Sequence, residues 1–127
     1  MIGTADEFIR LRQSNGMSDQ YRANHDTANV SVWLKIIKTY PDFKYWVIHN
    51  KTIQIEVLEI LCVDKDPKIR SAVARKKKIN DKIFDILRID SDINVRYTLL
   101  CNTKLPLEKI KTVKVDDSDW LKEKLAN

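Results

Sequence analysis

The side chains that could perform chemistry in this chain are few and lie far apart in the sequence. Two histidines, His25 and His49, and two cysteines, Cys62 and Cys101, all stand singly, without a CxxC pair or a histidine cluster. A structural zinc site needs about four ligands at recognisable spacing, so we expect no metal and no other cofactor. We predict surface or hydrogen-bonded roles for the histidines, and a reduced, buried state for both cysteines. Since no catalytic motif is present, the chain is predicted not to be an enzyme.

The one concentrated chemical feature is a run of positive charge, Arg-Lys-Lys-Lys at 75–78. Residues 64–88 hold nine Lys and Arg against four Asp, while the rest of the chain has fourteen charges of each sign, so this region carries the whole net charge of +5. A cation at a helix C-terminus is worth about 0.3–1 kcal/mol, and four in a row exceed that need. Two interpretations stay open: a solvated helix end, or a contact patch for an acidic protein face or a phosphate backbone.

An internal repeat indicates which elements position these residues. The segment DKDPKIR at 64–70 recurs as DSDINVR at 90–96, an offset of 26 residues. The same offset relates apolar positions on both sides of these segments, so about four repeats cover residues 30–125. The recurring acidic and basic residues are predicted to pair at the repeat corners, Asp64 with Arg70 and the equivalent residues in the next repeats.

Each repeat is predicted to form two short helices. In the second repeat, apolar residues at helical spacing predict helices over 53–63 and 67–76. Asp66 stands at the N-cap of the second of these helices and Pro67 at its first position. Helices this short are marginal alone, and neither can bury its apolar stripe within one repeat, so neighbouring repeats must stack.

Residues 1–29 precede the repeats and are predicted to form an N-terminal helical cap. Thr4 and Glu7 have capping-box spacing, which predicts a helix over 4–13, and a second short helix is expected over 18–24. Together the segments make a single domain, 1–127. Only two glycines occur in 127 residues, against a usual frequency of about 7%, and this scarcity favours an all-α fold. The apolar runs are too short to span a membrane, and the polar N-terminus predicts a cytoplasmic protein.

The motif Asp66-Pro67-x-Ile69-Arg70-x-x-Val73-Ala74, followed by an apolar helix, resembles the variant leucine-rich repeat and the broader HEAT and armadillo group. The resemblance implies an all-α fold, a short α-solenoid of about four two-helix HEAT-like repeats whose second helices line one surface. Some bacterial proteins of similar size and repeat type are immunity proteins, which neutralise toxins of interbacterial competition such as contact-dependent growth inhibition. This chain resembles them in length and in its lack of catalytic residues.

Three functions therefore remain in view. The first is an immunity protein, a monomer or part of a 1:1 complex, that binds and blocks a bacterial toxin such as a nuclease. The second is a nucleic-acid-binding protein that uses the basic run, and the third is a regulatory adaptor for another cellular protein. The residues predicted to contact the partner share a place near the end of a second helix: Trp46, His49, Asn50, Arg75, Lys76, Lys77 and Asn102.

Overall fold

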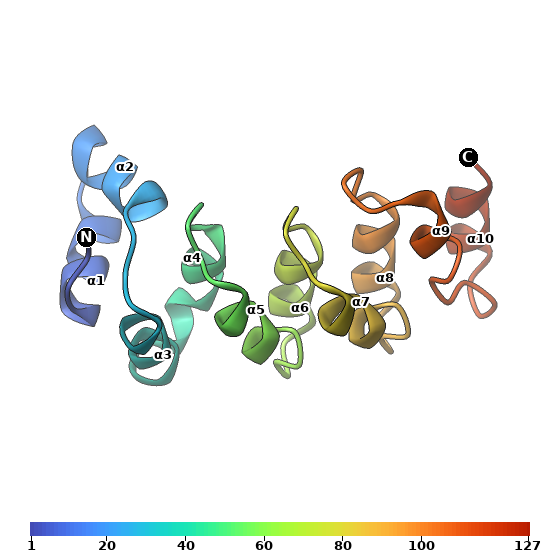
Figure 1. Cartoon of the computed structure of the whole chain (residues 1–127), viewed down its shortest axis with the longest axis horizontal. Helices are drawn as coiled ribbons and strands as arrows, with labels where there is room; N and C mark the ends of the chain where they lie inside the picture. Colours follow the sequence, from blue (N-terminus) through green and yellow to red (C-terminus); the bar gives the residue numbers. More distant parts are fainter. The chain divides into compact units, whose positions relative to one another are not determined.

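The structure is a computed structural model that describes all residues, 1–127, and it is helical throughout (Figure 1). Ten α-helices and one short 3₁₀ helix follow one another without a β-strand, which confirms the all-α prediction. No residue has a positive φ, so no turn requires glycine and two glycines suffice. The chain divides into two compact units, the N-terminal unit Met1–Val57 and the C-terminal unit Leu58–Asn127. The single-domain boundaries stay a prediction.

The N-terminal unit has an aromatic core. Phe8 and Trp33 are fully buried, and their rings meet edge to face with centroids 5.2 Å apart. Thr4 caps the first helix by accepting the backbone N–H of Glu7, as the capping-box spacing predicts. The helices of this unit are α1 (Ala5–Gln13), α2 (Met17–His25), α3 (Val30–Thr39), η1 (Pro41–Phe43) and α4 (Lys44–His49), while α5 (Ile55–Leu61) crosses the boundary between the units.

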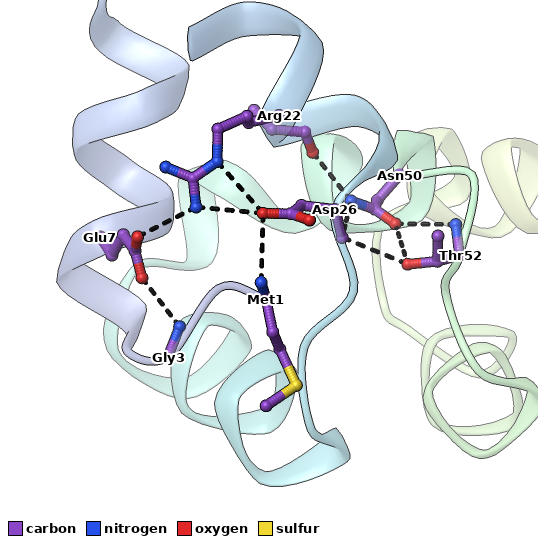
Figure 2. A network of polar contacts seen from close by, with 8 residues as sticks. Met1, Gly3, Glu7, Arg22, Asp26, Asn50 and Thr52 are labelled. Carbon is purple, nitrogen blue, oxygen red and sulfur yellow. Dashed lines mark hydrogen bonds and ion pairs between the residues drawn. The ribbon is translucent and has the colours of Figure 1, made fainter.

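A polar network joins α1 to α2 in the N-terminal unit (Figure 2). The Arg22 guanidinium lies 3.2 Å from Glu7 and 3.0 Å from Asp26, and the backbone N–H of Gly3 donates to Glu7 at 2.8 Å. The Gly3 hydrogen bond is the main cause that lowers the pKa of Glu7, and the Arg22 hydrogen bond lowers the pKa of Asp26.

We expect this network to make stability fall with acid. Because the pKa of each carboxylate is lower in the folded chain, its contribution is complete above the ordinary values, about 4.3 for Glu and 3.9 for Asp. It is lost as the pH falls through the lowered values. Thermal unfolding followed from neutral pH downward should show the decline begin near pH 4, and Asp26→Asn should flatten it. An unchanged acid slope in Asp26→Asn would show that Asp26 does not contribute.

In the C-terminal unit, the first and second helices of the repeats alternate along the chain. Asp66 and Asp92 cap the second helices in the same way, each accepting the backbone N–H two residues later. The second helices α6 and α8 lie side by side, α8 also contacts α10, and α7 contacts both α6 and α8 (Figure 1). The helices of this unit are α6 (Pro67–Ala74), α7 (Asp81–Leu87), α8 (Ile93–Leu100), α9 (Leu107–Ile110) and α10 (Asp119–Ala126).

The corner residues pair, but between repeats. Arg70 donates through Nε and Nη2 to Asp90 of the following repeat, at 2.8 and 3.1 Å, and its Nη1 donates to the backbone carbonyl of Asp64. Arg96 forms the equivalent bidentate pair with Asp117, at 2.7 and 2.9 Å. The predicted side-chain pairing of Asp90 with Arg96 is therefore replaced by a link to the next repeat, because the long arginine side chain reaches beyond its own corner.

Candidate functional site

The basic run follows directly after α6. Helix α6 ends at Ala74, and Arg75 is its C-cap residue. Arg75, Lys77 and Lys78 are exposed, whereas Lys76 is half-buried. The run thus forms the connection from a second helix to the next first helix, which is where the repeat predicts it.

A groove of about 370 Å³ lies between this connection and the end of α8. Two cations of the run, Arg75 and Lys77, line it together with a third cation, Lys104. None of the lining residues is acidic, and three of them carry hydroxyl groups. The other lining residues are Tyr97, Thr98, Cys101, Asn102 and Thr103. Three of the seven predicted contact residues, Arg75, Lys77 and Asn102, are therefore brought together.

Asn102 takes part in this groove as a structural residue. Its side chain is only 8% exposed, and its amide donates to the backbone carbonyls of Ala74 and Lys76 at 2.9 and 3.0 Å. Its Oδ1 accepts the backbone N–H of Lys104. The amide therefore satisfies carbonyls at the end of α6 that the helix itself leaves without partners. Asn102 as a direct partner contact stays a prediction, and the structure gives its side chain this internal role.

Asn50 has the same role in the N-terminal unit (Figure 2). It is fully buried, and its amide donates to the carbonyls of Ala23 and Asp26 at 2.8 and 3.0 Å. Its Oδ1 accepts from Thr52, as Oδ1 of Asn102 accepts from Lys104. Asn50 is therefore a second predicted contact whose side chain faces inward, because buried helix-end carbonyls require a donor.

Trp46 and His49 lie together on α4, with ring centroids 5.5 Å apart and nearly perpendicular planes. The guanidinium of Arg12 stacks on Trp46, 3.8 Å from the ring centroid, and donates to the side chain of Asn24. Burial lowers the pKa of Arg12. Both predicted residues are half-buried and partly committed to contacts inside the N-terminal unit.

Sequence reasoning missed an aromatic pair beside the basic groove. Tyr97 lines the groove, and Trp120 of α10 stacks on it with centroids 4.1 Å apart and planes 11° apart. Trp120 is 45% exposed, and the ammonium of Lys124 lies 5.9 Å from the Tyr97 ring centroid. The repeat offset relates Lys104 to Lys78 of the basic run, which is a signal for Lys104, whereas it relates Tyr97 to Ser71, which is none.

The two cysteines differ, which corrects the prediction that both are buried. Cys62 is fully buried, whereas Cys101 is exposed in the groove, and neither forms a disulfide. Burial and the nearby Glu59 raise the pKa of the Cys62 thiol.

We expect one thiol to react quickly with a disulfide reagent and the other to react slowly. In the native protein a disulfide reagent such as dithionitrobenzoate should titrate Cys101 rapidly and Cys62 only after unfolding, since the thiolate is the reactive form. The variant Cys101→Ser should abolish the fast phase. A fast phase that persists in this variant would contradict the burial of Cys62.

The groove can bind anions, and its chemistry is electrostatic. Its cations and the hydroxyls of Tyr97 and Thr103 suit a carboxylate or a phosphate, whereas the Thr98 hydroxyl donates to the backbone carbonyl of Asn94. The lining holds no imidazole. No group of three or more His, Cys, Asp or Glu residues lies close enough together to hold a metal ion. None of the helices combines the length and the apolar character that crossing a membrane requires.

The comparisons with known proteins found no match. No family model, no curated protein and no solved structure matches the chain. The geometry of the groove and of the repeats is therefore the basis for assigning a function.

Proposed function

We propose that this chain is a non-enzymatic protein-interaction module, a short α-solenoid of about four two-helix repeats that docks an acidic face of a partner. The observation that carries this proposal is the groove beside α6 and α8, where Arg75, Lys77 and Lys104 converge without a carboxylate in the lining. Such a surface attracts a negatively charged partner and selects against a positively charged one.

The packing inside the C-terminal unit supports the solenoid. Successive second helices contact each other, α6 with α8 and α8 with α10, and Arg70 and Arg96 each bond an aspartate of the following repeat. Contacts between neighbouring repeats of this kind are what a stacked array requires. The open faces of the second helices then offer a surface for docking.

The most specific form of the proposal is an immunity protein that blocks a bacterial toxin in the cytosol. Its mechanism is steric and electrostatic: the bound chain covers the toxin and performs no chemistry. The resemblance of the chain to immunity proteins in length and in its lack of catalytic residues supports this form, as does a groove that offers charge and hydroxyl groups. A regulatory adaptor would use the same surface on another cellular partner.

Affinity capture tests the proposal. The intact chain, used as bait in nuclease-treated cytosol from its own cells, should retain one protein in a 1:1 ratio. For the immunity form, that protein should arrest growth when it is expressed alone and should be harmless when it is expressed with this chain. Retention of no protein contradicts the interaction module, and a captured protein without toxicity contradicts the immunity form.

One observation favours a second candidate, a nucleic-acid-binding protein. The exposed Trp120 stacked on Tyr97 is an aromatic platform beside three cations, and such platforms hold unpaired bases. Binding to oligodeoxythymidine should then weaken steeply with salt, with a slope of roughly 0.7 per phosphate contacted. A response that is flat in salt would remove this candidate.

A further inference from the structure

We infer that the groove receives a short peptide segment of the partner in which carboxylates alternate with apolar side chains. The inference rests on the proposed function and adds to it the place and the chemistry of the contact. The carboxylates would meet Arg75, Lys77 and Lys104, and the apolar side chains would meet the stacked pair of Tyr97 and Trp120.

The size of the groove favours a short segment. A volume of about 370 Å³ lies at the lower end of the roughly 300–1,000 Å³ typical of ligand pockets. It has room for a few side chains and none for a helix or a folded domain. The cations approach from two connections, Arg75 and Lys77 from the one after α6 and Lys104 from the one after α8.

The charge of the groove favours carboxylates even though two helices end there. A helix C-terminus carries roughly half a negative charge, so α6 and α8 together oppose an anion with about one charge. Three full positive charges outweigh it. At the end of α6, moreover, the Asn102 amide covers the carbonyls of Ala74 and Lys76, which reduces their repulsion of a bound carboxylate. The planar guanidinium of Arg75 can accept a carboxylate through two parallel hydrogen bonds.

The aromatic pair supplies the apolar half of the contact. Tyr97 belongs to the groove lining, and the 45% exposure of Trp120 leaves much of its ring available. Both residue types are enriched among the residues that dominate binding energy at protein interfaces. Charge alone would give a weak contact that salt screens, whereas an adjoining aromatic surface adds burial that salt does not weaken.

The surroundings favour a peptide over a nucleic acid strand. On α10 and in the connection before it, the exposed carboxylates of Asp116, Asp119 and Glu123 alternate with the exposed ammonium groups of Lys114 and Lys122. A single strand carries a phosphate at every nucleotide, so a strand that follows the groove onto α10 brings some of its phosphates against these carboxylates. A peptide can place an apolar residue there instead.

Nuclear magnetic resonance on the isotope-labelled full chain tests the inference. The probe is a short acetylated and amidated peptide of alternating Glu and Leu, with matched peptides in which Gln replaces Glu or Ser replaces Leu. We expect the Glu-Leu peptide to shift the backbone amides of Arg75, Lys77 and residues 97–104, and the indole N–H of Trp120. Each matched peptide should bind about tenfold more weakly. Shifts confined to other residues, or none at high peptide concentration, would overturn the inference.

Charge-reversal variants provide a second test of the inference. Lys77→Glu with Lys104→Glu should weaken peptide binding by about tenfold or more. The control Lys65→Glu with Lys68→Glu makes the same change of net charge at exposed lysines near the other end of α6, and it should change binding less than about twofold. Equal loss in both double variants would mean that binding follows net charge alone. Oligodeoxythymidine that binds the groove more tightly than the peptide would also overturn the inference in favour of a nucleic acid.

The two proposals can fail separately. If affinity capture retains the same stoichiometric protein with the wild-type chain and with the Lys77→Glu, Lys104→Glu variant, the interaction module stands and the groove is the wrong place. If the Glu-Leu peptide occupies the groove while capture retains no protein, the groove chemistry stands and the proposed function fails.

Discussion

Replacing Asp90 with alanine is expected to lower the free energy of unfolding by about 3 kcal/mol. The Asp90 side chain is 6% exposed, and it accepts two hydrogen bonds from Arg70 and one from the backbone N–H of Asp92. The Arg70 side chain is itself only 15% exposed, so the substitution leaves a largely buried guanidinium without its counter-ion. Removing one member of a buried ion pair costs more than the pair contributes, because the remaining charge is not resolvated.

Urea unfolding of the wild type and of Asp90→Ala measures the effect. Asp85→Ala is the matched control, since Asp85 lies on α7, is 71% exposed and sits 3.8 Å from Arg88; it should change stability by less than about 0.5 kcal/mol. The double variant Arg70→Met, Asp90→Leu should recover more than half of the loss, because it removes both charges together. Equal stability of Asp90→Ala and Asp85→Ala would show that the link between these repeats is dispensable.

The helices could be read from the sequence where local chemistry determines them. Asp66 caps α6 and Pro67 begins it, as predicted, because capping depends on residues only a few positions apart. The carboxylate that pairs with Arg70 could not be predicted in the same way. The repeat shows that an aspartate and an arginine recur, but the choice between Asp64 and Asp90 depends on how closely neighbouring repeats approach.

The candidate site, too, could be predicted from the sequence only where local features determine it. Arg75 and Lys77 could be predicted, because a dense charge run is visible in the sequence itself. Tyr97 belongs to the site because the end of α8 lies beside the end of α6, and this packing also brings Lys104 to the basic run. Cys101 was predicted to be buried from its residue type, yet the repeat relates it to the exposed Arg75, and position in the repeat decided the outcome.

Asn102→Ala is the second substitution with a large expected effect, about 2 kcal/mol of lost stability. The amide is the donor for the carbonyls of Ala74 and Lys76 and the acceptor for the N–H of Lys104. Alanine cannot replace any of these hydrogen bonds, and 8% exposure leaves water little access to the groups that remain. Thermal unfolding should show the loss, since 1 kcal/mol corresponds to about 3–6 °C in a domain of this size.

Thr103→Ala is the control, because Thr103 lines the same groove, is exposed and neighbours Asn102. It should leave stability within about 0.5 kcal/mol of the wild type. Asn102→Asp separates the two parts of the role: it keeps the acceptor for Lys104 but sets a carboxylate against two carbonyl oxygens. We therefore expect it to destabilise the chain at least as much as alanine does. If both Asn102 variants kept full stability, the carbonyls at the end of α6 would not need this amide, and the structural role of Asn102 would be wrong.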